Sequence, residues 1–134
     1  SSAASDVYKR QVENRHTGAL ELIVGSSGGS RIITANILTT YAYLSHHGQV
    51  SMDDVIARPR WHDQLLPPVT MFEYPGAQTP GFDNATVRAL TAKGHQAAYT
   101  APGLSNAQAI QHMHAGLWHA ASERRQYEAR GAAI

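Results

Sequence analysis

The residues best suited to chemistry lie in one glycine-rich stretch, GSSGGSR at residues 25–31. The apolar residues 19–24 before it predict a buried strand, and residues 32–38 after it begin a helical pattern. A strand that turns through glycines into a helix directs several backbone N–H groups into one concavity, which favours an anion. Gly28 and Gly29 lack a Cβ, so a ligand can approach closely and positive φ costs little.

Several interpretations of this stretch remain open on its residues alone. The glycines are also typical of a simple turn. A P-loop is disfavoured, because the Gly-Lys-Ser/Thr ending is replaced by Gly-Ser-Arg. The pattern G-x-S-x-G fits a nucleophile elbow with Ser27 as nucleophile, and a serine hydrolase would then find partners in Asp83 and His95. Alternatively, the N–H groups of Gly28 and Gly29 form an oxyanion hole for a nucleophile located elsewhere.

Histidines near the end of the chain form a second candidate set. Residues 106–114 and 117–122 predict a hairpin around a two-residue turn, which would bring His112, His114 and His119 together. Three imidazoles are a known zinc ligand set, so a non-enzymatic His-rich metal-binding module is an alternative function. Because such histidines more often line a solvated face, we expect no resident metal and no cofactor.

Composition excludes several other classes of protein. The chain has 134 residues, a net charge of +1 and no basic run, so nucleic acid is not an expected partner. No apolar run approaches the about 18 residues that span a bilayer. Without cysteine there is neither a disulfide nor a thiolate zinc site.

The elements that must position these residues follow in the order strand, long helix, short helix, strand, helix and about three strands, an α+β pattern. Ile33, Ile37, Tyr41 and Leu44 recur at helical spacing in the long helix. Ser30, Ser51 and Asp83 are predicted helix N-caps. Residues 6–11 resemble a translated sequencing adapter, so we expect a disordered scar over 1–11 and a partial domain over 12–134, cut from a longer protein.

The ordered motifs resemble the gamma-glutamyltranspeptidase family. They are GSSGGSRIIT at 25–34, ARPRWHDQLLP at 57–67, LTAKGH at 90–95, SNAQAI at 105–110 and AAS at 120–122. The resemblance implies part of an N-terminal nucleophile hydrolase αββα sandwich, with mixed or antiparallel sheets and helices packed on them. It also implies a precursor that cuts itself into large and small subunits, of which this chain is the C-terminal part of the small one.

The implied activity is that of a gamma-glutamyltransferase or glutathione hydrolase. An N-terminal Thr attacks the gamma-glutamyl amide of glutathione, with its own α-amine as base, and the acyl group passes to water or to an amino acid or peptide. That Thr is absent from this chain, so the isolated chain is expected to be inactive. The resemblance assigns Gly28 and Gly29 to the oxyanion hole, where they are both catalytic and substrate-binding residues.

The resemblance also implies partners and a location. The partners are gamma-glutamyl compounds, amino acid or dipeptide acceptors, the large subunit and the remainder of the small subunit. The location is extracytosolic: periplasmic, cell-surface, vacuolar or secreted. Arg31, His62 and Gln64 match the family as scaffold residues. Residues 123–125, Glu-Arg-Arg, replace the usual Asp-Pro-Arg and open a charged segment, 123–130, that we expect to be solvated.

Overall fold

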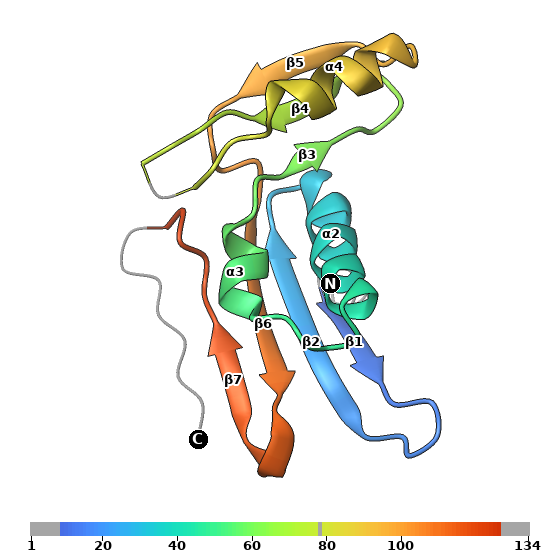
Figure 1. The fold of residues 1–134 in the computed structure, drawn as a ribbon, viewed down its shortest axis with the longest axis vertical. Coiled ribbons are helices and arrows are strands. Elements are labelled where there is room, and N and C mark those ends of the chain that lie inside the picture. The colour runs from blue at the N-terminus through green and yellow to red at the C-terminus, as the bar shows by residue number, and fades with distance from the viewer. Residues whose placement is uncertain (1–8, 78, 127–134) are drawn as a thin grey trace.

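The computed structural model of this chain describes residues 9–77 and 79–126. Two sheets and three α-helices make up the fold (Figure 1). The elements, in chain order, are β1 (Lys9–Glu13), β2 (Leu20–Ser27), α2 (Arg31–Ser45), α3 (Met52–Ala57), β3 (Trp61–His62), β4 (Thr70–Glu73), α4 (Asn84–Ala92), β5 (Ala97–Thr100), β6 (Asn106–His112), the 3₁₀ turn η1 (His114–Gly116) and β7 (Trp118–Ala121). The predicted α+β class is confirmed.

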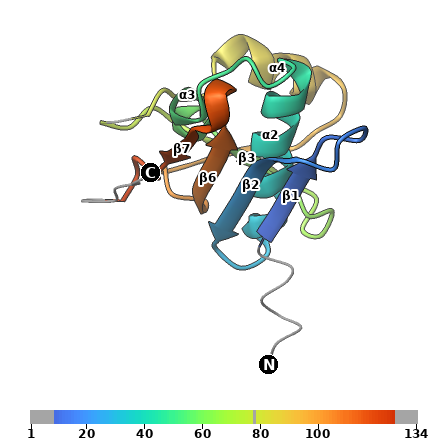
Figure 2. The same cartoon turned by 90° about the horizontal axis from the view of Figure 1, so that it is seen from below.

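The larger sheet has the strand order β1-β2-β6-β7, and each neighbouring pair is antiparallel. β2 and β6 are its central strands, and their pairing runs up to Ser27 and Asn106, directly beside the glycine loop. Helices α2 and α3 cover one face of this sheet, as the view from below shows (Figure 2). This arrangement brings the end of β2 and the start of α2 to one end of the sheet.

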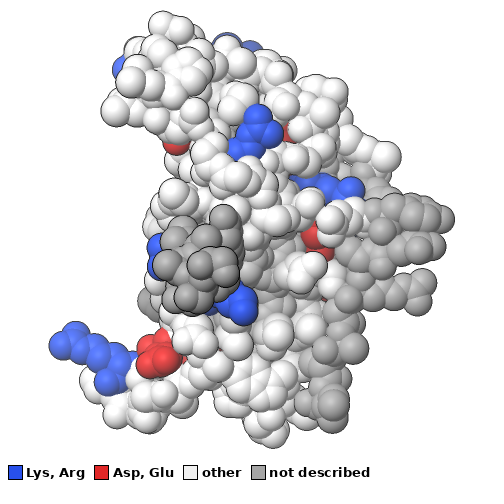
Figure 3. Space-filling model, turned by 180° about the vertical axis from the view of Figure 1, so that it is seen from behind, with Lys and Arg blue, Asp and Glu red and all other residues white. Residues whose placement is uncertain are grey.

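The core lies between this sheet and its helices. Side chains of alternate strand residues point toward the helices, since successive residues of a strand face opposite sides. The buried cluster consists of Leu22, Val24, Ala42, Tyr43, Met52, Val55, Ile56, Ala109 and Ala121. The opposite face of the sheet shows mostly uncharged side chains where it is visible (Figure 3).

The smaller sheet has the order β3-β4-β5, with β3 and β4 antiparallel and β4 and β5 parallel. A parallel pair needs a crossover connection, and α4 supplies it. The predicted cap of α4 is confirmed, because the Asp83 carboxylate accepts from Thr86 N–H at 2.8 Å. Ser30 and Ser51 occupy the N-cap positions of α2 and α3, as predicted, but their side chains make no capping hydrogen bond.

The apolar stripe of α2 faces solvent. Ile33, Ile37, Tyr41 and Leu44 are 52–70% exposed, while the buried side is formed by Ile32, Ala35, Asn36, Thr39, Ala42 and Tyr43. The periodicity therefore located the helix without indicating which face packs against the sheet. The buried face mixes small, polar and large side chains, so apolar spacing alone does not mark it.

Three further features differ from the sequence-based expectations. Residues 9–11, which we assigned to a disordered leader, pair with β2 as part of β1, while residues 1–8 lie outside the described residues. β3 was not predicted. The final hairpin is present, but its strands are joined by η1 and closed by a hydrogen bond from Met113 N–H to the Leu117 carbonyl, not by a two-residue turn. Within residues 9–77 and 79–126, no helix is long and apolar enough to cross a membrane.

Candidate active site

The glycine loop connects the end of β2 to the first turn of α2. Gly28 has φ +134° and Gly29 has φ +66°, both in the region that side-chain-bearing residues rarely adopt. A Cβ at Gly28 would lie 3.1 Å from the Ser105 Cα and 3.2 Å from the Leu104 carbonyl oxygen, whereas one at Gly29 would meet nothing within 4 Å. Gly28 is therefore required by both its conformation and its surroundings, and Gly29 by its conformation alone.

The N–H groups of both glycines are available to a ligand. Among the described residues, neither donates a hydrogen bond, and both residues are exposed. The Gly28 carbonyl accepts from Arg31 N–H at 3.4 Å, so it points toward α2. Because a trans peptide holds its C=O and N–H on opposite sides, the Gly29 N–H points away from the helix. The loop therefore keeps unpaired donors at a helix N-terminus, the arrangement that an oxyanion hole needs.

A hollow of about 300 Å³ adjoins the loop on the open face of the large sheet. Its wall includes Ser27, the residue that precedes Gly28, while the two glycines themselves are not among its lining residues. The other lining residues are Lys9, Gly25, Ser26, Asn106, Gln108 and Gln126. Polar side chains and one cation thus surround the space next to the candidate oxyanion hole.

Polar side chains under the loop anchor the first turns of α2. Ser26 Oγ donates to Asn36 Oδ1 at 2.6 Å and joins β2 to the helix. Thr34 Oγ1 lies 2.9 Å from His62 Nδ1, and His62 Nε2 lies 3.0 Å from Gln64 Oε1. His62 is buried, so it and Gln64 brace the helix from the smaller sheet. These contacts agree with a scaffold role for His62 and Gln64. Arg31 begins α2, where it adds positive charge beside the loop.

The triad of the serine-hydrolase alternative, Ser27, Asp83 and His95, is not assembled in the described residues. Ser27 lies within β2 and pairs with Asn106, so it is not at the apex of a sharp turn. The Asp83 carboxylate is taken up by Thr86 at the cap of α4, and His95 contacts Thr70 beside the smaller sheet. No described hydrogen bond links Ser27 to either residue.

The histidine cluster is not assembled either. His112 pairs with Trp118 and its ring stacks on that indole at a centroid distance of 4.8 Å. His119 pairs with Gln111 on the other face of the hairpin and contacts Asp53 at 2.8 Å, and His114 lies in η1. Within the described chain, no group of three potential metal ligands occurs. The predicted shared face of these histidines is therefore wrong, because strand alternation separates His112 from His119.

A buried network of four charges stands behind the loop. Arg60 Nη1 contacts Glu123 Oε2 at 2.7 Å, and Arg125 Nη2 contacts Glu73 Oε2 at 2.7 Å. Arg125 Nη1 also reaches Glu123 Oε1 at 3.0 Å, and all four side chains are at most 5% exposed. The expectation of a solvated segment is wrong for Glu123 and Arg125, while residues 127–130 lie outside the described chain. No local pattern indicates this network, because Arg60 and Glu123 are far apart in the chain.

Arg60 and Glu123 stabilise each other's charged form. Burial alone raises the pKa of Glu123, but the Arg60 guanidinium and the Ala107 N–H hold that pKa below its ordinary value. Burial lowers the pKa of Arg60, and Glu123 opposes this shift. A guanidinium titrates so high that Arg60 stays cationic. The contact between Arg60 and Glu123 is therefore an ion pair.

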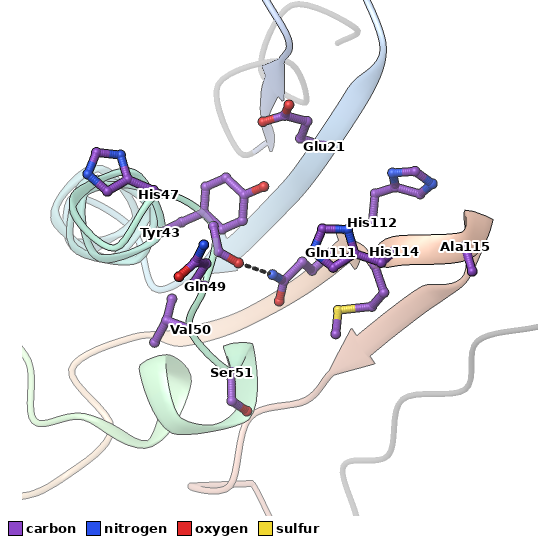
Figure 4. Close-up of a pocket in the computed structure, with 12 residues that line it drawn as sticks. Glu21, Tyr43, His47, Gln49, Val50, Ser51, Gln111, His112, His114 and Ala115 are labelled. Carbon is purple, nitrogen blue, oxygen red and sulfur yellow. Dashed lines mark hydrogen bonds between the residues drawn. The ribbon is translucent and has the colours of Figure 1, made fainter.

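A second concavity lies at the C-terminal end of α2 (Figure 4). This groove, of about 750 Å³, is separated from the glycine loop by a 15-residue helix, about 22 Å long. Gln111 Nε2 donates to the Gly48 carbonyl at 2.8 Å inside it. Burial and the nearby Glu21 carboxylate raise the pKa of Tyr43 in its wall. None of the residues of the glycine loop lines this groove.

Comparison with known proteins identifies the family. The family model described as gamma-glutamyltranspeptidase matches residues 11–133. The chain belongs to the gamma-glutamyltranspeptidase family. A glutathione hydrolase of Aspergillus flavus is 31% identical over 93 residues, which cover 69% of this chain and 14% of that protein. A glutathione hydrolase proenzyme of Arthroderma benhamiae is 28% identical over 111 residues, or 83% of this chain and 18% of that protein.

Solved structures agree on the fold of this gamma-glutamyltranspeptidase family member. The T380A mutant of Helicobacter pylori gamma-glutamyltranspeptidase superposes with a TM-score of 0.72 at 24% identity, covering 88% of this chain and 61% of the other. The likeness confirms the predicted fold of antiparallel and mixed sheets with helices packed on them. The chain spans less than a fifth of the length of the two curated relatives.

Proposed function

We propose that this chain is part of a gamma-glutamyltransferase or glutathione hydrolase and supplies its oxyanion hole. The observation that carries the proposal is the pair of adjacent amides at Gly28 and Gly29, which donate no hydrogen bond within the described residues and lie at a helix N-terminus, where the preceding Ser27 lines a polar hollow. The family membership supplies the reaction, and these amides supply the chemical role.

In the proposed reaction, the hydroxyl of an N-terminal Thr outside this chain attacks the gamma-glutamyl carbonyl carbon. The α-amine of that Thr takes the proton, and the carbonyl oxygen becomes an anion. The N–H groups of Gly28 and Gly29 donate to that oxygen, and one such donor lowers the barrier by about 3–4 kcal/mol. Collapse expels the amine and leaves an acyl-enzyme, which then reacts with water or with an amino acid or dipeptide.

The proposed partners follow from this assignment. The substrates are glutathione and other gamma-glutamyl compounds, and the remaining protein partners are the large subunit and the rest of the small subunit of one precursor. The open, largely uncharged face of the large sheet is compatible with packing against such a partner (Figure 3). We propose an extracytosolic location for the whole protein on the strength of the resemblance to the family.

The test compares the isolated 134-residue chain with the protein expressed from the coding sequence extended upstream. We expect the extended protein to release the aniline from a gamma-glutamyl anilide and the isolated chain to be inactive. Ser27→Ala should leave the activity of the extended protein within a few-fold of wild type. Loss of activity in that variant, together with labelling of Ser27 by a fluorophosphonate, would instead establish the serine-hydrolase alternative.

A further inference from the structure

The backbone of residues 103–107 forms the wall against which Gly28 lies. Among the contacts that a Cβ at Gly28 would make, the nearest are Ser105 Cα at 3.1 Å, the Leu104 carbonyl oxygen at 3.2 Å and Ser105 Cβ at 3.2 Å. Leu104 and Ser105 are buried, so the wall is packed on both sides. Because backbone meets backbone here without an intervening side chain, a shift of residues 103–107 changes the position of Gly28 directly.

The buried charges fix this wall at four backbone groups. Glu73 Oε1 accepts from the N–H groups of Gly103 and Leu104, at 2.9 and 3.3 Å. Arg60 Nη1 donates to the Ser105 carbonyl. Glu123 Oε2 accepts from Ala107 N–H at 2.9 Å. Hydrogen bonds to ionised groups are stronger and more directional than neutral ones, so these contacts define the wall's position closely.

Other contacts hold the charges themselves in place. Arg60 N–H donates to Glu73 Oε2 at 2.8 Å, which joins the start of β3 to the end of β4. Arg125 donates to the carbonyls of Ile56 and Arg58, at 2.8 and 2.7 Å, behind α3. Stability alone does not require such an arrangement, because well-packed apolar residues often replace a buried ion pair without loss. Apolar side chains, however, cannot hold four backbone groups in a fixed direction.

We propose that Glu73, Arg60 and Glu123 are positioning residues for the oxyanion hole. They fix the backbone of residues 103–107, and this segment sets the direction in which the Gly28 N–H faces the reacting carbonyl oxygen. The inference rests on the proposed function and deepens it. Its consequence is that weakening the network reduces stabilisation of the tetrahedral oxyanion more than binding of the planar substrate.

The experiment uses the enzyme extended upstream to include the nucleophile. Two ligands are compared: a boronate analogue of the gamma-glutamyl group, whose tetrahedral adduct places an oxygen in the hole, and a non-reactive planar gamma-glutamyl amide. For Glu73→Gln and Arg60→Lys, we expect boronate affinity and kcat to fall by about tenfold to a hundredfold. KM and the affinity for the planar amide should stay within about twofold, because both quantities reflect binding of the planar ground state.

The matched control is Gln111→Met, which removes a buried hydrogen bond at the other end of β6. It should lower the melting temperature while leaving the ratio of boronate to amide affinity unchanged. If Glu73→Gln and Arg60→Lys fold and keep the wild-type ratio, the positioning role is refuted. A parallel loss of affinity for both ligands in these variants also refutes it, since that indicates a general structural role.

The two proposals fail separately. If Gly28→Ala retains wild-type kcat, the assignment of the oxyanion hole is wrong. If Gly28→Ala is inactive but the charge variants keep the wild-type ratio, only the positioning role is wrong. Should neither charge variant fold, hydrogen exchange of the wild-type enzyme decides. Boronate binding should then slow exchange of the amides at residues 103–107, and unchanged exchange there would overturn the inference.

Discussion

The two ends of α2 differ in the burial of the polar groups around them. Toward the N-terminal end, four charged side chains are buried in mutual contact, and the two glycine amides have no hydrogen-bond acceptor among the described residues. At the C-terminal end, His47 and His112 are exposed and line an open groove. This contrast indicates that unpaired backbone N–H donors on a rigid support identify a candidate site better than the number of titratable side chains does.

The largest expected effect is on catalytic activity, and it should differ between substitution of Gly28 and substitution of Gly29. Gly28→Ala combines a disfavoured φ with contacts of 3.1–3.2 Å to Leu104 and Ser105, so we expect kcat/KM of the extended enzyme to fall on the order of 10²–10³-fold. Gly29→Ala meets no neighbour within 4 Å and costs about 1–2 kcal/mol of backbone strain. Steady-state kinetics on a gamma-glutamyl anilide give kcat/KM for both variants. Equal activity in the two variants would contradict the packing argument.

Breaking the charge network should cost more stability than breaking an exposed pair. Arg60→Met leaves Glu123 buried without its main cationic partner, and we expect the free energy of unfolding to drop by about 3–5 kcal/mol. The exposed pair of His119 and Asp53 provides the control, since Asp53→Asn should cost less than about 1 kcal/mol. Urea unfolding followed by circular dichroism gives both values. Similar losses in the two variants would remove the energetic contrast between the regions.

Acid should destabilise the protein through the same network. The pKa of Glu123 lies below its ordinary value of 4.5, so its contribution to stability is present above pH 4.5 and is lost as the pH falls through the lower folded-state pKa. Glu123→Gln removes this proton-linked contribution. We expect its free energy of unfolding to depend less steeply on pH below 4.5 than that of the wild type, in urea titrations at several pH values. Identical slopes would show that Glu123 does not titrate differently in the folded protein.

Zinc should have the smallest effect. His112 is stacked on Trp118, His119 is engaged by Asp53, and no described group of three ligands exists to gather an ion. We expect no change in melting temperature when Zn²⁺ is added at one equivalent. Stoichiometric binding by calorimetry that disappears in His112→Ala would show that the hairpin histidines bind metal after all.

The sequence was informative where structure depends on neighbours along the chain. The glycines at a strand-to-helix connection, the N-cap at Asp83 and the hairpin after residue 105 are all local patterns, and each has a counterpart in the structure. The helical periodicity of α2 located the helix. It did not reveal the buried face, because that face combines apolar with polar residues such as Asn36 and Thr39, while the apolar Ile37 is exposed.

The sequence was least informative about contacts between distant residues. Glu73, Arg60 and Glu123 meet only after the two sheets have docked, and no spacing rule links them. A charged segment such as 123–126 is ordinarily solvated, so its local composition favoured exposure. The orientation of the loop amides also depends on tertiary contacts. The assignment of Gly28 and Gly29 to an oxyanion hole stays a prediction for kinetics to test.

The distance along the chain between the members of the charge network has a consequence for the order of folding. Residues 60, 73, 123 and 125 must all be synthesised before the wall beside Gly28 is complete, and contacts between such distant residues form slowly. The elements up to α4 can form earlier, since much of their hydrogen bonding is local. The loop is therefore expected to acquire its final shape only when residues 123–125 have left the ribosome.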